Sequence, residues 1–239
     1  MAPETNSFKK GIFDGIPIAL GYLTVAFAFG ISACEQGLTV IETLLISMTN
    51  VTSAGQLAAV PIMTAGGSLF ELCGAQLVIN MRYSLMSVSL SQKLGKSVRL
   101  RDRFLISFVN TDEVFAVASA QNGTVGKKYL YGLILTPYIG WSTGTLLGAA
   151  AGKILPAVVV SALSIAIYGM FVAIVVPEAK KSRAVALCAL FSAGLSCLFR
   201  YTPFLSKVPT GFVIMICALF ASALFALIFP IDTSTKEEN

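Results

Sequence analysis

The sequence predicts an all-α integral membrane protein, a polytopic helical bundle in which some helices are discontinuous or re-entrant. Of the 239 residues, 56% are hydrophobic and only 12% are charged, whereas an average soluble domain has about 25% charged residues. The apolar segments are long and continuous, unlike the alternating strands of a membrane β-barrel. Polar residues nevertheless interrupt two of these segments, as in "NVTSAGQ" at 50–56.

Eight apolar segments with short connections indicate a single transmembrane domain over 1–239. They fall at 11–33, 39–66, 68–92, 103–122, 129–151, 156–177, 184–200 and 207–230. A helix needs about 20 residues to cross the hydrocarbon core of a bilayer. Lys9 and Lys10 precede the first segment and place the N-terminus in the cytoplasm. We therefore expect a multi-pass protein of the cell membrane.

The second segment, 39–66, is expected to form two half-length helices that enter and leave on the same side. It is longer than the about 20 residues that one span needs, and its middle is polar. Basic residues at 93–103 mark the loop after the third segment as cytoplasmic. Three full crossings from a cytoplasmic N-terminus cannot end there. One long tilted helix is the alternative.

The fourth segment, 103–122, shows a second interruption. Its "ISFVN" at 106–110 resembles "ISMTN" at 46–50, and polar residues follow both. If 103–122 also returns to its own side, the lysines at 127–128 and 180–181 are cytoplasmic and Lys207 is outside, as the positive-inside rule favours. Units 39–92 and 103–151 would then form an inverted repeat, as in many secondary transporters. A full span over 103–122 is the alternative.

The first interruption contains no acid and offers groups that suit a carboxylate. Thr52 and Ser53 are expected to cap the second half-helix, whose free backbone N–H groups favour an anion. Gln56 lies one turn further on and can add a hydrogen bond, and Asn50 and Gly55 belong to the same stretch. The alternative is a polar kink whose groups are satisfied internally.

The second interruption carries acids. Asp112 and Glu113 follow Asn110 and would occupy the first turn of a half-helix, where the helix dipole stabilises carboxylates. Charged side chains at membrane depth are functional candidates by default. We expect one of the two acids to bind a substrate ammonium or to carry a coupling proton. Simple capping of a helix near a membrane surface is the alternative.

Further polar residues lie in the first and third segments. Arg82 is expected to pair with Asp112 or Glu113, or to bind a substrate carboxylate as a fork-shaped donor; snorkelling towards lipid headgroups is the alternative. Glu71, near the start of its segment, is expected at the membrane interface. The predicted substrate-binding set is Tyr22, Asn50, Thr52, Ser53, Gly55, Gln56, Asn80, Arg82 and Asn110.

The composition also narrows the functional classes. Histidine is absent, which removes the usual general base and most zinc sites. The five cysteines, Cys34, Cys73, Cys188, Cys197 and Cys217, show no metal-ligand spacing and are interpreted as small packing residues. We expect no metal, no cofactor and no enzymatic activity. Lysines and arginines lie mainly in loops, so the bilayer, and no nucleic acid, is the expected partner.

Five motifs carry a resemblance over nearly the whole chain. They are "GIPIALGYLTVAFAFG" at 15–30, "TSAGQ" at 52–56, "NMRY" at 80–83, "NTDEVF" at 110–115 and "VPTGFVIMICALFASAL" at 208–224. With these motifs the chain resembles the AzlC family of branched-chain amino-acid permeases, the large subunit of a two-component exporter. The family's second motif usually reads more like Ala-Ser-Gln, so Gly55 stands where a serine is expected. This departure bears on substrate preference.

The resemblance implies a secondary transporter that exports valine, leucine, isoleucine and related compounds. It also implies proton coupling and a small AzlD-like membrane subunit as partner. The residues themselves favour an amino-acid substrate, because one interruption has acids and the other has none, which complements a zwitterion. A channel for a small solute is the alternative, since paired half-helices also build pores. A purely structural subunit has little reason to carry deep charges.

Overall fold

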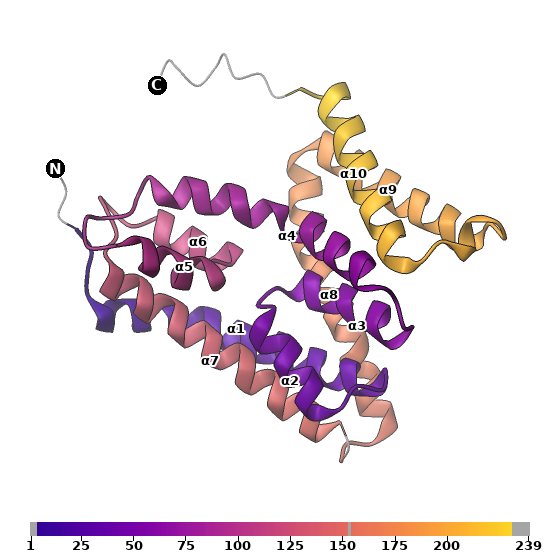
Figure 1. The fold of residues 1–239 in the computed structure, drawn as a ribbon, viewed down its shortest axis with the longest axis horizontal. Coiled ribbons are helices and arrows are strands. Elements are labelled where there is room, and N and C mark those ends of the chain that lie inside the picture. Colours follow the sequence, from indigo (N-terminus) through magenta and orange to yellow (C-terminus); the bar gives the residue numbers. More distant parts are fainter. Residues whose placement is uncertain (1–3, 153, 231–239) are drawn as a thin grey trace. The chain divides into compact units, whose positions relative to one another are not determined.

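The computed structural model describes residues 4–152 and 154–230, and these are helical nearly throughout (Figure 1). The described ranges contain no β-strand, which confirms the all-α prediction. The helices are α1 (Phe8–Glu35), α2 (Val40–Thr49), α3 (Ser53–Thr64), α4 (Leu69–Ser91), α5 (Leu100–Phe108), α6 (Asp112–Ser119), α7 (Lys127–Ala151), α8 (Ala157–Lys181), α9 (Arg183–Tyr201) and α10 (Thr210–Ile228), with a short 3-10 helix, η1 (Leu205–Lys207).

Several of these helices are long enough to cross a bilayer. Within the described residues, α1, α9 and α10 meet this requirement by both length and apolar composition. Helices α4, α7 and α8 have 23, 25 and 25 residues, which is enough by length alone because about 20 residues span the hydrocarbon core. The full number of spans remains a prediction.

Both segments predicted to be interrupted are divided into two helices. Segment 39–66 consists of α2 and α3, with residues 50–52 outside either helix, so the alternative of one long tilted helix is wrong. Segment 103–122 consists of α5 and α6, with a break at 109–111. A long helix follows each pair, α4 in the first case and α7 in the second. The shared order of elements supports a repeat, but its inverted symmetry remains a prediction.

The chain forms two compact units that alternate along the sequence. The first comprises residues up to 60 together with 80–167, and the second comprises 61–79 together with the residues from 168 onwards. Neither unit is a continuous stretch of sequence, because the chain passes between them within α3, α4 and α8. The prediction of a single domain over 1–239 is not tested by this division.

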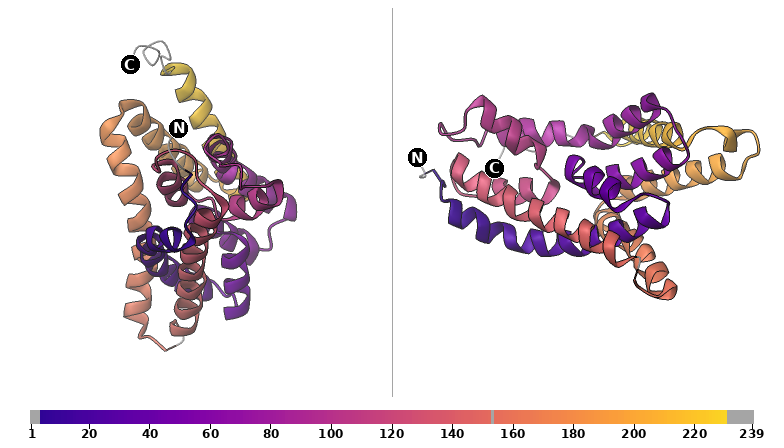
Figure 2. Two further views of the ribbon diagram at one scale, coloured as in Figure 1. Left: turned by 90° about the vertical axis from the view of Figure 1, so that its left-hand side faces the viewer. Right: turned by 60° about the horizontal axis from the view of Figure 1, so that its bottom comes forward.

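The centre of the first unit is the close parallel pairing of α1 with α7, which lie side by side in Figures 1 and 2. Glycines allow the two backbones to touch, as in small-residue packing between membrane helices. A Cβ atom at Gly140 would lie 2.5 Å from the carbonyl oxygen of Ala19. Matching contacts join Gly11 to Tyr129 and Gly148 to Phe27, so both helices run in the same direction.

The basic end of the first unit is the place where segments 4–10, 93–99 and 124–128 meet. Backbone hydrogen bonds of 2.9 Å and 2.8 Å join Thr5 to Thr124 and Gly95 to Val125. Because α1 and α7 are parallel, their N-terminal lysine pairs, 9–10 and 127–128, lie at this same end. This grouping of basic residues agrees with the predicted placement of these loops on one side.

The α5–α6 pair begins and ends at the basic end. Asp102, in the first turn of α5, accepts hydrogen bonds from the Tyr131 hydroxyl at 2.6 Å and the Arg99 N–H at 2.8 Å. These bonds, the first above all, hold the pKa of the Asp102 carboxyl below its usual value. At the other end of the pair, Lys93 donates to the carbonyl groups of Ser119 and Gln121. A re-entrant course across a membrane remains a prediction.

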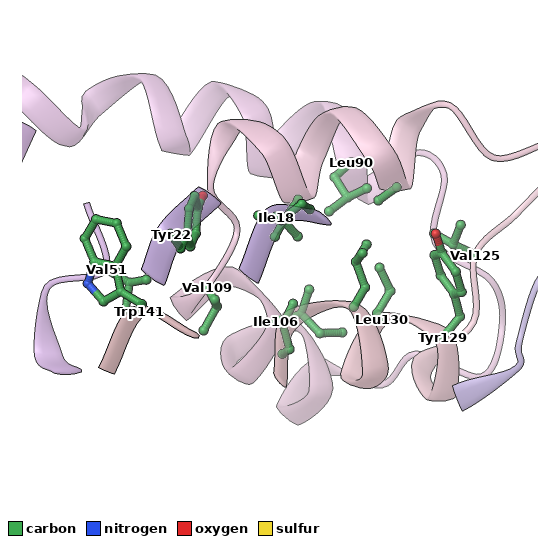
Figure 3. Close-up of a cluster of buried hydrophobic side chains, with 14 of the residues drawn as sticks. Ile18, Tyr22, Val51, Leu90, Ile106, Val109, Val125, Tyr129, Leu130 and Trp141 are labelled. Carbon is green, nitrogen blue, oxygen red and sulfur yellow. The ribbon is translucent and has the colours of Figure 1, made fainter. Parts of the chain in front are cut away.

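A hydrophobic cluster joins the basic end to the helix breaks. Figure 3 shows Val125 and Tyr129 at one end of the cluster and Val51, Tyr22 and Trp141 at the other. The cluster includes Val51 from the first break and Val109 from the second, so the same core holds both breaks in place.

Candidate functional site

The two helix breaks meet at one cavity of about 240 Å³ in the first unit. It is lined by Thr49, Asn50, Val51, Thr52, Asn80, Tyr83, Ser107, Phe108, Asn110 and Thr111. The lining comes from the C-terminal ends of α2 and α5, both breaks, and the middle of α4. None of these side chains is charged, and the polar ones offer hydroxyl and amide groups.

A threonine with a buried hydroxyl stands at each break. Thr52 and Thr111 directly precede α3 and α6, and their side chains are 6% and 5% exposed. The Thr52 hydroxyl has no hydrogen-bond partner within the described part of the chain, whereas the Thr111 hydroxyl lies beside the Tyr22 hydroxyl and can bond to it. The expected capping of α3 by the Thr52 side chain is therefore wrong. Leaving a buried hydroxyl unpaired costs about 1–3 kcal/mol, so a ligand that pairs with it gains affinity.

Two buried amides extend this set. Asn110 is 3% exposed, and its Nδ2 donates to the Ser87 hydroxyl at 3.1 Å, while its Oδ1 has no partner among the described residues. Gln56 is fully buried on α3, and neither atom of its amide has a partner in the described ranges. Gln56 does not line the cavity, so its predicted contact with substrate needs a rearrangement of α3.

On its α3 side the cavity favours an anionic group, whereas Asp112 and Glu113 occupy the first turn of α6. The N-termini of both α3 and α6 begin at its wall, and a helix N-terminus carries free N–H groups and the positive end of the helix dipole. The lining itself supplies no opposing charge.

The predicted acids lie in the first turn of α6, beside the break, and each has a partner. Asp112 forms an ion pair of 2.9 Å with Arg82 of α4, with the two side chains 45% and 51% exposed. The pairing of Arg82 with one of these acids is as predicted. Arg82 also donates to the Tyr83 hydroxyl at 3.2 Å, which directs it towards the cavity lining.

Glu113 turns towards α1 and accepts a hydrogen bond from the Tyr22 hydroxyl. The Tyr22 ring packs edge-on against Trp141 of α7, with ring centroids 5.0 Å apart (Figure 3). The two adjacent acids thus connect α6 to different neighbours, α4 and α1. A change in the charge or partner of either acid would therefore alter the contacts that hold the second break, 109–111, in place.

The structure brings together only part of the predicted set. Asn50, Thr52, Asn80 and Asn110 line the cavity. Tyr22, Arg82, Asp112 and Glu113 form the contacts beside it. Ser53, Gly55 and Gln56 lie on α3 outside the lining.

Six other residues that line the cavity were not predicted, namely Thr49, Val51, Tyr83, Ser107, Phe108 and Thr111. Three of these stand inside the quoted motifs "ISMTN" and "ISFVN", and Tyr83 ends "NMRY". These three motifs were therefore the sequence signal from which most of the missed lining residues could have been predicted.

A second, largely apolar cavity of about 210 Å³ adjoins the first and shares Ser107 and Asn110 with it. Its other walls are Ser87, Leu90, Ser91, Leu94, Leu100, Arg103, Phe104 and Ile106. The described residues contain no cluster of histidine, cysteine or acidic side chains that would hold a metal ion. The pair of cavities suits a small molecule with one anionic end and one apolar end.

Comparisons with known proteins agree on one family. The model of the family described as AzlC protein matches residues 17–155, which is more than half of the chain. An uncharacterized membrane protein of Archaeoglobus fulgidus is 34% identical over 179 residues, covering 74% of this chain and 78% of the relative. Inner membrane protein YgaZ of Escherichia coli is 30% identical over 156 residues, covering 64% of each chain. No solved structure matches the chain significantly.

Proposed function

The chain belongs to the AzlC family of membrane proteins, and from that premise we propose that it is a secondary transporter exporting branched-chain or other hydrophobic amino acids. The strongest support is the polar cavity at the two helix breaks, which is lined by the unpaired Thr52 hydroxyl and the unpaired Oδ1 of Asn110. Discontinuous helices with N-termini facing the substrate carboxylate are a recurring design of secondary transporters.

The substrate would lie with its carboxylate between Thr52 and Thr111, where the α3 and α6 N-termini converge. Its apolar side chain would occupy the adjoining cavity beside Leu90 and Phe104. Its ammonium would be attracted by Asp112, at the cost of part of the ion pair with Arg82. Binding would therefore loosen the contact between α6 and α4, which connects occupancy of the site to a movement of the second break.

The proposal includes a small AzlD-like membrane subunit as partner and the proton gradient as driving force. We expect an inner-membrane location with a cytoplasmic N-terminus, and no enzymatic activity. Reconstitution into proteoliposomes, with and without the small subunit and with a panel of labelled amino acids, tests these points together. Saturable flux that depends on the pH gradient supports a transporter. Flux that rises linearly with concentration and ignores the gradient indicates a channel instead.

The acids provide a sharper test. Asp112→Asn or Glu113→Gln should abolish export in a cell-based assay while the protein still inserts in the membrane. Glu178→Gln is a matched control, because Glu178 pairs with Lys181 at 2.7 Å on an exposed surface and exposed pairs contribute little. Wild-type export by both site variants would remove the proposed role of these acids.

A further inference from the structure

A groove between α4 and α5 adjoins the polar cavity in the first unit. It is the largely apolar cavity of about 210 Å³ described above. Each of its two walls is a stripe of side chains at positions i, i+3, i+4 and i+7, which lie on one face of a helix. The stripes are Ser87, Leu90, Ser91 and Leu94 along and just after α4, and Leu100, Arg103, Phe104 and Ser107 along α5. The groove therefore follows the length of α5.

At its inner end the groove joins the polar cavity, with which it shares Ser107 and Asn110. Asn110 is 3% exposed, and its Nδ2 donates to the Ser87 hydroxyl at 3.1 Å. Its Oδ1 is buried without a partner among the described residues. A buried acceptor that lacks a partner favours a molecule that supplies a donor. The ammonium of an amino acid is such a donor, so the junction of the two cavities offers it a contact.

The outer end of the groove lies at the basic end of the unit. Leu94 forms a backbone bridge with Val125, where segments 93–99 and 124–128 meet. Leu100 begins α5 directly after the first of these segments. The positive-inside rule places this end in the cytoplasm. The groove thus leads from the helix breaks to the predicted cytoplasmic surface.

Arg103 gives the outer part of the groove a charge. Among the described residues that line the groove or the polar cavity, it is the one with a charged side chain. It is exposed and forms no ion pair within the described ranges. A guanidinium can bind a carboxylate through two parallel hydrogen bonds, and a cation lining a cleft attracts anionic groups to it. An amino acid arriving from the basic end would meet Arg103 before Asn110.

We propose that this groove is the passage through which an amino acid moves between the cytoplasm and the polar cavity. Arg103 receives the carboxylate in the outer part, and Asn110 accepts a hydrogen bond from the ammonium at the inner end. Once the substrate is bound, its apolar side chain stays in the groove beside Leu90 and Phe104. The proposal rests on the proposed transport function and adds the route by which the substrate reaches its site.

A lipid chain is the competing occupant of the groove. Leu100 and Phe104 are each 71% exposed, as residues that face lipid are, and Arg103 would then extend to the headgroups. The two interpretations differ in whether water fills the groove. Ser91 lines the groove, whereas Ser89, two residues earlier on α4, does not. Ser89 is the more exposed of the two, so exposure alone predicts the opposite order of reactivity from a water-filled passage.

The first experiment introduces Ser91→Cys or Ser89→Cys into a chain whose five native cysteines are replaced. Inside-out membrane vesicles present the cytoplasmic face to a charged, membrane-impermeant thiosulfonate reagent. Because a thiol reacts as the thiolate, which forms in water but not in lipid, we expect Ser91→Cys to be labelled about tenfold faster than Ser89→Cys. Added leucine should slow this labelling. Equal labelling of the two variants, or labelling that leucine does not slow, would overturn the passage.

The second experiment compares Arg103→Gln with Arg101→Gln in the same vesicles. Both variants remove one positive charge from α5, but Arg101 is an exposed residue outside the lining. The loss of a hydrogen bond to a charged group corresponds to about tenfold or more in binding. Arg103→Gln should therefore slow the entry of labelled leucine at subsaturating concentration by about tenfold, and Arg101→Gln by less than about twofold. Equal entry rates for the two variants would overturn the role of Arg103.

These outcomes separate the passage from the proposed function. If the passage alone is wrong, the wild-type protein moves leucine but Ser91→Cys is labelled no faster than Ser89→Cys. If the wild-type protein moves no leucine, the proposed function is overturned, and the groove as a route for amino acids is overturned with it.

Discussion

The unpaired hydroxyl of Thr52 gives the most direct prediction about the cavity. Thr52→Val removes a buried hydroxyl that has no partner among the described residues. Because burying an unpaired hydroxyl costs about 1–3 kcal/mol, the variant should be as stable as the wild type or more stable. A hydrogen bond to a charged group contributes about 1.5–3 kcal/mol. Losing one to a substrate carboxylate should therefore weaken binding by roughly 10- to 150-fold.

Thr145→Val is the matched control. The Thr145 hydroxyl is fully buried between α2 and α7 and forms a hydrogen bond of 2.6 Å with Ser47. Its removal should lower stability by about 0.6 kcal/mol and by at most about 1.7 kcal/mol, the mean and the maximum for hydrogen bonds between membrane helices, and should leave substrate affinity unchanged.

The assay measures two quantities for each variant. Thermal unfolding in detergent reports stability, and the concentration dependence of leucine exchange in proteoliposomes reports affinity. We expect Thr52→Val to lower the affinity for leucine without lowering stability, and Thr145→Val to lower stability without changing the affinity. If Thr52→Val were destabilised as much as Thr145→Val, or if it bound leucine as tightly as the wild type, the hydroxyl would be a structural group and the cavity assignment would be wrong.

Two further predictions concern the helix pair and the basic end. Gly140→Val should destabilise the protein by about 1–3 kcal/mol, because the new side chain overpacks against α1. Gly21→Ala, where a Cβ atom has open space around it, should be neutral or stabilising by about 0.5–1 kcal/mol. Equal unfolding temperatures for the two variants would contradict the backbone contact between α1 and α7. Tyr131→Phe should lower stability at neutral pH, because the hydroxyl depresses the pKa of Asp102. That stabilisation is present above the pKa of about 3.9 that Asp102 has in the unfolded chain, and it is lost as pH falls through the lower pKa of the folded protein. The unfolding temperatures of the wild type and Tyr131→Phe should therefore converge below about pH 4. A difference in unfolding temperature that stays constant down to acidic pH would exclude this cause.

Local sequence signals were sufficient for the helices and their breaks. Polar residues in the middle of the apolar segment 39–66 and after "ISFVN" marked the interruptions, because lipid offers no partner to an exposed backbone group. Charge complementarity predicted that Arg82 would pair with Asp112 or Glu113, and the partner is Asp112. Both inferences, the helix breaks and the ion pair of Arg82, depend on the composition of short stretches of sequence, and the structure confirms both.

Contacts between distant segments could not be predicted in the same way. The parallel fit of α1 against α7 depends on the register of glycines more than 100 residues apart. The burial of Glu71 depends on Gly211, 140 residues further along the chain. Likewise, the partner of Glu113 is Tyr22 because α1 and α6 are neighbours, which no single segment reveals. The cavity was therefore predicted only in its three asparagines and Thr52, and its other polar and apolar lining residues were not predicted.

Protection of an engineered thiol tests the central claim most directly. Cysteine is introduced at Thr52, or at Asn122 as an exposed control at the basic end, in a chain whose five native cysteines are replaced. If the helix breaks form the substrate cavity, saturating leucine should slow the labelling of the cysteine at Thr52 by a soluble thiol reagent and leave the control unchanged. Equal labelling rates at Thr52 with and without leucine, in protein that exchanges leucine, would contradict the account.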